Sequence, residues 1–229
     1  MADLTSSFDN PTSQNPISQG GLFNSGPGTW VDGQTTAGGA FAATAADVYC
    51  AAFAATTSPG AAIGSDQYSQ TTLGTRASIY GYDGPLCRGQ GTGAGQGDCY
   101  HLESFFEVVN KMARVYQVDD NGTTITQNQI GADITYTPTS GHVIRIECTG
   151  SGPVTIVAIV NGSSSNRDDS SSPYLTGGQP GLWLYANDTA TTIASDWGGG
   201  DLGAAKTPEL YESSSHPLAM WQAFSVCSF

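Results

Sequence analysis

The sequence is poor in charged residues, and positive charge is the scarcer kind. Charged residues make up 12% of the 229-residue chain, against about 25% in an average protein. Only two of them are lysines, and the formal net charge is −13. Nucleic acids and anionic membrane surfaces are bound largely through lysine and arginine, so neither is expected as a partner. An acidic surface remains compatible with bound cations or with a basic partner.

Long apolar segments and export signals are also missing. No run of 18 apolar residues occurs, so no transmembrane helix is predicted. Residues 1–20 lack the basic segment and the apolar segment of a signal peptide. Two explanations stay open: the protein is used without this export route, or a leader was removed from a longer chain.

The five cysteines do not match a zinc site. No C-x2-C pair is present, and the chain has only three histidines. Cys87 and Cys99 flank a glycine-rich loop, where a disulfide would stabilise the fold by about 3 kcal/mol. Free thiols are the alternative for this pair. Cys148 alternates with Ile144 and Ile146, which favours a small core residue, and an odd number of cysteines leaves at least one unpaired within the chain.

No convincing amphipathic helix is visible, and the apolar residues come instead in short alternating runs. Clusters of Gly, Ser, Pro, Asn and Asp separate these runs, which is typical of all-β proteins. About eleven short strands without βαβ spacing predict a two-sheet antiparallel β-sandwich, or jelly roll, with a single core. The predicted strands are Thr29–Val31, Gly39–Thr44, Asp47–Ala54, Gln67–Leu73, Ser78–Tyr82, Tyr100–Val109, Ala113–Val118, His142–Thr149, Val154–Val160, Gly181–Tyr185 and Ile193–Trp197. The segment 161–173, rich in Ser and Asp, is predicted to be a break between strands.

Residues 104–117, SFFEVVNKMARVYQ, present the one serious helical alternative. Phe105, Val108 and Met112 have helical spacing. The β-branched and aromatic content favours two strands joined by an Asn-Lys turn, and this is our prediction.

Several segments, taken in order along the chain, resemble motifs of the concanavalin A-like lectin/glucanase family. The resemblance is to its laminin-G-like form, which is common in bacterial and phage proteins. The matching segments are SSFDN (6–10), GYDGPLCRG (81–89), GHVIRIEC (141–148), VTIVAIVNG (154–162), GGQPGL (177–182) and SDWGGG (195–200).

This resemblance covers roughly residues 5–202 and implies a concanavalin A-like jelly roll. We therefore expect one domain over residues 1–202. Residues 203–229 are expected to form a C-terminal tail or arm, or a last edge strand. The chain departs from the family pattern at this tail, and it has His142 where the family usually has Asp.

A catalytic set is not apparent. A retaining glycosidase needs two carboxyl groups about 5 Å apart. Glu103 and Glu107 share a strand face, but the strand rise separates them by about 13 Å. There is no G-x-S-x-G segment for a nucleophilic serine, and the scarcity of lysine disfavours a lyase. We therefore expect no enzyme activity.

Two kinds of ligand are considered. For a sugar, the candidate side chains are Tyr82, Arg88, Tyr100, Trp183, Tyr185 and Trp197. Most aromatic side chains of a sandwich belong to its core, and Trp183 and Tyr185 share one face, so both should be buried or both displayed. For Ca²⁺, which members of the family often bind, the resemblance points to Asp9, Asp196 and Asp201, and residues 166–172 form a second candidate. Ordinary solvated turn carboxylates are the alternative.

Three functional hypotheses result. The first is a non-enzymatic component of a virion surface, such as a capsid decoration, fibre or tail protein, oligomeric with other subunits and with glycan binding as an added role. The second is a stand-alone carbohydrate-binding lectin module that binds polysaccharide. The third, ranked lowest, is a secreted glycoside hydrolase or polysaccharide lyase. All three predict a protein on a virion surface or outside the cell.

Overall fold

The computed structural model describes residues 3–6, 23–24, 31–32, 34–35, 41–42, 48–54, 63–74, 81–90, 97–106, 111–120, 124–171, 173–186 and 192–202. Within these ranges the chain forms seventeen β-strands and no helix. A helix that could cross a membrane is accordingly not found in this part of the chain. Leu202 is the last described residue, so the tail 203–229 and the predicted domain boundary stay predictions.

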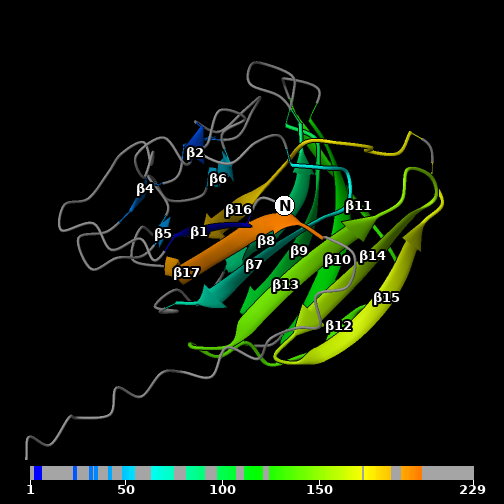
Figure 1. Cartoon of the computed structure of the whole chain (residues 1–229). Helices are drawn as coiled ribbons and strands as arrows, with labels where there is room; N and C mark the ends of the chain where they lie inside the picture. The colour runs from blue at the N-terminus through cyan, green and yellow to red at the C-terminus, as the bar shows by residue number, and fades with distance from the viewer. Residues whose placement is uncertain are drawn as a thin grey trace, which may run out of the picture.

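The strands form two sheets that stack face to face (Figure 1). Sheet A has the order β15 (Ser163–Asp169), β14 (Val154–Val160), β13 (Val143–Thr149), β7 (Gln67–Leu73), β17 (Thr192–Asp201), β5 (Phe41–Ala42) and β4 (Gln34–Thr35), and β1 (Asp3–Ser6) pairs with β17. Sheet B has the order β11 (Ile125–Gln129), β10 (Lys111–Asp120), β9 (Cys99–Phe106), β8 (Gly81–Gly89), β16 (Gln179–Ala186), β6 (Val48–Ala54) and β2 (Phe23–Asn24). The short strands β12 (Ile134–Thr135) and β3 (Val31–Asp32) pair with β10 and β6. All described pairings are antiparallel except that of β3 with β6.

The main core lies between the two sheets. Sheet A contributes the inward side chains of β13 and β14, and sheet B contributes those of β8, β9 and β10. Its members include Cys87, Tyr100, Leu102, Ala113, Val115, Ile144, Ile146, Cys148, Ile156 and Ala158. Two strands of sheet A thus face three strands of sheet B, and their inward side chains form a continuous apolar layer. The predicted two-sheet sandwich is confirmed.

The hairpin of β13 and β14 follows the sequence pattern closely. Ile144 and Ile146 are fully buried, and Arg145 lies on the opposite face. The turn residues Asn161 and Gly162 have φ values of 47° and 83°, which is the left-handed region that an Asn-Gly turn requires. Strand β14 has the predicted bounds, as does β7.

The segment 163–169 differs from the prediction, because it forms strand β15 and not a break. Its sequence is SSSNRDD, and it pairs with β14 over its whole length. The strand lies at the edge of sheet A, where side chains can stay in water, so low hydrophobicity does not prevent pairing. Residues 104–106 and 111–117 lie on β9 and β10, which pair antiparallel, so the helical alternative is wrong for these residues.

We call the face of sheet B that points away from sheet A the outer face of sheet B. It carries a second apolar cluster. Its buried members come from four neighbouring strands and from β6: Ala51, Phe53, Leu86, Cys99, Val118 and Trp183. Tyr82, Tyr185 and Ile125 pack against them and stay partly exposed. Aromatic rings therefore gather on this face.

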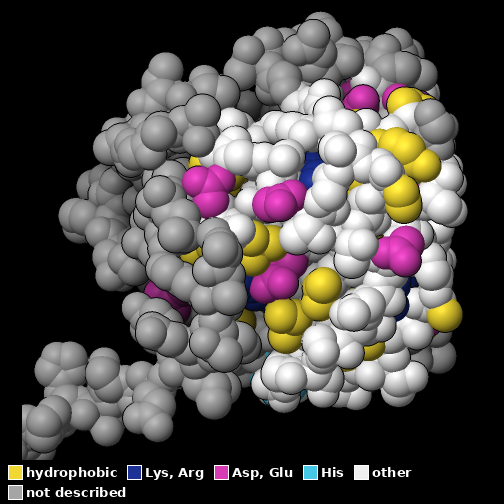
Figure 2. Space-filling view, turned by 45° about the vertical axis from the view of Figure 1, so that its right-hand side comes forward, with side chains coloured by type: hydrophobic (Ala, Val, Ile, Leu, Met, Phe, Trp, Pro, Cys, Tyr) yellow, Lys and Arg dark blue, Asp and Glu magenta, His cyan; other side chains and the backbone are white. Residues whose placement is uncertain are grey.

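One face of the molecule is shown in Figure 2, and its chemistry matches the composition. Uncharged polar side chains and backbone atoms dominate, acidic side chains occur singly, and basic ones are few. The exposed β15 residues agree with this picture, and they are Ser163, Ser164, Asn166 and Asp168.

Candidate ligand-binding face

Four of the six side chains predicted to bind a sugar are buried. Arg88, Tyr100 and Trp183 have no exposed surface, and Trp197 is 2% exposed. The pair on strand β16 is split, because Trp183 is buried whereas Tyr185 is partly exposed. The structure thus leaves Tyr82 and Tyr185 as the predicted residues that a ligand can reach.

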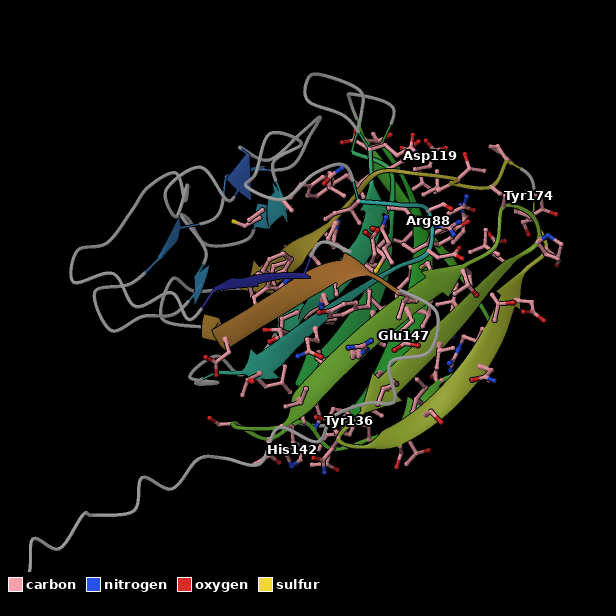
Figure 3. The ribbon with its side chains drawn as sticks, viewed as in Figure 1. Arg88, Asp119, Tyr136, His142, Glu147 and Tyr174 are labelled. Carbon is pink, nitrogen blue, oxygen red and sulfur yellow. The ribbon has the colours of Figure 1, made fainter. Side chains whose placement is uncertain are left out.

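Arg88 is a structural residue that ties three loop segments to the end of strand β8. Its guanidinium donates to the carbonyl oxygens of Ser65 at 2.9 Å, Leu175 at 2.5 Å and Gly150 at 2.6 Å. Its backbone has a φ of 54°, so the strand alternation breaks here and the side chain turns into the end of the sandwich. Figure 3 shows Arg88 at the end that also carries Asp119 and Tyr174, opposite Tyr136 and His142.

Tyr100 and Trp197 also serve the fold. The Tyr100 hydroxyl donates to Asp169 Oδ2 at 2.7 Å and accepts from the Leu175 backbone N–H at 3.2 Å. Burial, followed by the hydrogen bond to Asp169, raises the pKa of Tyr100. Trp197 donates through Nε1 to Ser69 Oγ at 2.9 Å and crosses to the Gly181 carbonyl of sheet B at 3.3 Å. Both side chains therefore join one sheet to the other.

The predicted disulfide between Cys87 and Cys99 is wrong. Both thiols are free and fully buried. In the register of β8 and β9, Cys87 lies opposite Tyr100, so its neighbour Cys99 points to the other face. Cys87 belongs to the core between the sheets, and Cys99 belongs to the outer face of sheet B.

Two of the predicted calcium ligands, Asp196 and Asp201, do not lie together. They are on the same strand, five residues or about 16 Å apart. The carboxylate of Asp201 accepts a hydrogen bond from the backbone N–H of Gly64. Asp9 lies outside the described residues. Within the described residues no group of three or more His, Cys, Asp or Glu side chains is arranged to hold a metal ion.

The outer face of sheet B does bring together a different set of side chains. Tyr82 and Tyr185 stack with ring centroids 5.7 Å apart, and Tyr82 meets Phe105 edge to face at 4.5 Å. These rings come from β16, β8 and β9, which are adjacent in the sheet. Two of the three are partly exposed, and they form a continuous aromatic surface.

A planar ion pair continues this aromatic surface. The Arg114 guanidinium lies 4.6 Å above the Phe105 ring and binds Asp133 through two hydrogen bonds, of 2.7 and 3.0 Å. The Tyr116 hydroxyl is 3.4 Å from Arg114, and Gln129 donates to Asp133 at 2.8 Å. This fork geometry lowers the pKa of Asp133, so the carboxylate stays ionised. We call the six residues Tyr82, Tyr185, Phe105, Arg114, Tyr116 and Asp133 the sheet B strip.

A buried histidine lies beside the strip. The His101 ring is 4.1 Å from Trp183 and 5.4 Å from Tyr116. Its Nε2 is 3.4 Å from Gln127 Nε2, and its Nδ1 has no hydrogen-bond partner among the described residues. Burial lowers the pKa of His101 to about 3, so the imidazole is neutral at physiological pH and one of its nitrogens is an acceptor.

Strands β8 and β9 lie too close at Gly84 to admit a side chain. A Cβ at Gly84 would lie 1.9 Å from the carbonyl oxygen of Leu102. That carbonyl accepts a hydrogen bond of 3.4 Å from Trp183 Nε1. The indole of Trp183 therefore reaches across β8 to β9, beside His101.

The sequence pattern also indicates this face, although the choice of sugar candidates by side-chain type did not include most of its residues. Alternation along β9 and β10 sends His101, Glu103 and Phe105 to one face together with Arg114 and Tyr116. Because the hairpin was predicted, those residues could have been paired. The contribution of Asp133 could not, since it follows from the way residues 130–135 fold back on β10.

Comparisons with known proteins agree on the fold. No family model and no curated protein sequence matches the chain. A solved Bacillus subtilis protein of unknown function with a galectin-like fold aligns over 82% of this chain and 94% of its own, at 12% identity and a TM-score of 0.51. A legume lectin-like domain from Entamoeba histolytica (85% and 98%, 12% identity, TM-score 0.45) and porphyranase B from Zobellia galactanivorans (86% and 90%, 11%, 0.44) are also similar.

The Bacillus subtilis structure shows the fold and no more, because its sequence identity to this chain is low. The chain is a β-sandwich of the concanavalin A-like, galectin-like type, which the sequence resemblance predicted.

Proposed function

We propose that this protein is a carbohydrate-binding protein of the lectin type and that the sheet B strip is its binding site. The observation that carries the proposal is the aromatic surface of Tyr82, Tyr185 and Phe105, which continues into the planar Arg114–Asp133 pair. A sugar ring has an apolar C–H face and an edge of hydroxyl groups. Aromatic faces cover the first, and carboxylate and guanidinium groups bind the second.

His101 lies beside the strip, but its ring is completely buried, so a ligand does not contact it directly. Trp183 and Tyr116 hold the ring from two sides. The charges of Arg114 and Asp133 cancel within the strip, and the neighbouring Glu103 side chain is buried, which favours an uncharged glycan.

We propose binding without cleavage. Asp133 lies in the strip and Glu103 lies beside it, and their carboxylates do not suit the acid and nucleophile roles of a glycosidase. Glu103 is 2% exposed, and Asp133 is held in a bidentate ion pair that lowers its pKa. A general acid needs the opposite shift. Release of reducing ends from a bound polysaccharide would overturn this part of the proposal.

The experiment is a glycan-array measurement on the full chain, followed by calorimetry with a glycan that binds. Tyr185→Ala and Asp133→Asn are expected to weaken binding tenfold or more, because each removes a ligand-facing contact worth about 1.4 kcal/mol. Circular dichroism establishes that the variants fold.

The outer face of sheet A supplies a matched control. There Arg145 lies 3.9 Å above the Tyr68 ring and binds Glu147 at 2.6 Å, so the chemistry resembles that of Arg114, Phe105 and Asp133. Glu147→Gln is expected to leave glycan binding unchanged. Loss of binding in Glu147→Gln with retention in Asp133→Asn would move the site to sheet A.

The virion-surface role and the accompanying oligomer remain predictions from the sequence. The two roles are compatible, because a surface subunit can present a glycan-binding face. Light scattering of the purified chain and a search for the chain in purified virus particles test the assembly role. If the chain is a monomer and is absent from the particles, only the lectin role remains.

A further inference from the structure

Two free thiols meet in the core between the sheets. Cys87 lies on β8 of sheet B and Cys148 on β13 of sheet A, and both have no exposed surface. They belong to the same buried cluster. Neither takes part in the sheet B strip.

The two backbones come unusually close at this point. The Cys87 thiol donates to the carbonyl oxygens of Ile146 at 3.5 Å and Gln67 at 3.8 Å, both on sheet A. Stacked sheets are usually about 10 Å apart, and a cysteine side chain is only two bonds long. Cys148 shares its face with Ile146 and is the register partner of Gln67. The carbonyls that Cys87 reaches therefore flank Cys148.

The other described cysteines are differently placed. Cys99 points to the outer face of sheet B. Cys50 lies on β6, and β16 separates that strand from β8, which puts the two strands about 10 Å apart. Cys148 is therefore the described cysteine that lies within reach of Cys87.

We propose that Cys87 and Cys148 form a disulfide that joins sheet B to sheet A when the chain folds in the presence of a small-molecule disulfide such as oxidised glutathione. One thiolate attacks the oxidant and releases one glutathione thiol, leaving a mixed disulfide. The second cysteine thiolate then attacks the protein sulfur and releases the second glutathione thiol. The two cysteines lose two electrons and two protons, and one oxidised glutathione becomes two reduced molecules.

The timing of this step follows from burial. Burial raises the pKa of the Cys87 thiol, and its hydrogen bond with Cys148 raises it further. A protonated, inaccessible thiol exchanges slowly, so the bond should form while the chain folds and should then resist reduction. The redox state of the pair would report whether the chain folds in an oxidising compartment.

The sequence makes the experiment direct, because trypsin places each cysteine in a different peptide. The peptides are 1–76 with Cys50, 77–88 with Cys87, 89–111 with Cys99, 146–167 with Cys148 and 207–229 with Cys227. The full chain is refolded from denaturant with reduced and oxidised glutathione, or with a reductant alone. Free thiols are alkylated, and the digest is analysed by mass spectrometry without reduction.

We expect peptide 77–88 to be linked to peptide 146–167 after refolding with oxidised glutathione, and the melting temperature to rise by about 10 °C over the reduced chain. Cys99→Ala should keep the linkage and the shift, and Cys148→Ala should lose both. The proposal is overturned if Cys87 is alkylated in the oxidised, folded chain, if it links to another cysteine, or if only the reduced chain regains its β-sheet spectrum.

Discussion

The two faces of sheet B are built by the same strands but have different side chains. Toward sheet A, β9 presents Tyr100 and Leu102 to an apolar core. Away from sheet A, the same strand presents His101, Glu103 and Phe105, which mix aromatic, acidic and imidazole groups. Both sets are almost completely buried, so burial alone does not distinguish the faces.

The two faces differ in what surrounds their polar atoms. On the inner side the Tyr100 hydroxyl has both an acceptor and a donor partner. On the outer side His101 Nδ1 has no hydrogen-bond partner among the described residues, and a buried atom of this kind costs stability. The comparison teaches that the inner face maintains the fold, whereas the outer face combines buried rings with exposed aromatic and charged groups, as the proposed binding role requires.

Replacement of Arg88 by methionine should have the largest effect on stability. Arg88 was predicted to contact a ligand, but it binds three loop carbonyls that would lose their donor. We expect the free energy of unfolding to fall by about 4 kcal/mol, measured by urea denaturation. Arg114→Met, which removes a partly exposed arginine, is the control. A loss below about 1 kcal/mol in Arg88→Met would show that water replaces the guanidinium.

Truncation of the inner face comes next. Leu102→Ala leaves a cavity between the sheets and should lower the free energy of unfolding by about 3 kcal/mol. Met112 lies on the outer side of the neighbouring strand and is partly exposed, so Met112→Ala should cost about 1 kcal/mol. Urea titrations of both variants check the order. Equal losses would contradict the division between the faces.

The inner face could be predicted from the sequence, and the outer face only in part. Alternation in 143–149 and 154–160 assigned inside and outside correctly because every inward residue there is apolar. It failed at β15, since an edge strand needs no apolar side chains. Arg88, a predicted sugar contact outside the predicted strands, is buried because its positive φ turns the side chain into the end of the sandwich.

The aromatic residues were misjudged for a different reason. Residue type cannot distinguish a tryptophan in the core from one on display, and Trp183 and Trp197 both proved buried. The Cys87–Cys99 pairing depended on sequence proximity, whereas the register puts these thiols on opposite faces. Contacts between distant segments, such as Arg114 with Asp133, depend on the turn geometry of residues 130–135.

The pH dependence of stability should reveal His101. Its folded pKa is about 3 and its unfolded pKa is about 6.5, so only the unfolded chain binds this proton between those values. Stability that is present above pH 6.5 is therefore lost as the pH falls toward 3, by up to about 1.4 kcal/mol per pH unit. His101→Gln removes this contribution and should flatten the curve of unfolding free energy between pH 6.5 and 4. Parallel curves for the two proteins would mean that His101 titrates normally in the folded state.

The smallest effect on stability is expected for Asp133→Asn. This variant gives the sharpest test of whether the outer face of sheet B binds a ligand and the inner face maintains the fold. Asp133 is exposed and paired with Arg114, and exposed ion pairs contribute less than about 1 kcal/mol. Its pKa is lowered by Arg114, so the small contribution is present near neutral pH and is lost as the carboxylate protonates in acid. The urea midpoint at pH 7 should therefore barely move, although glycan binding should weaken tenfold or more. A variant that loses binding while it keeps stability is what a binding face predicts. If Asp133→Asn instead destabilised the protein as much as Leu102→Ala does, the strip would be part of the fold, and the distinction between the faces would fail.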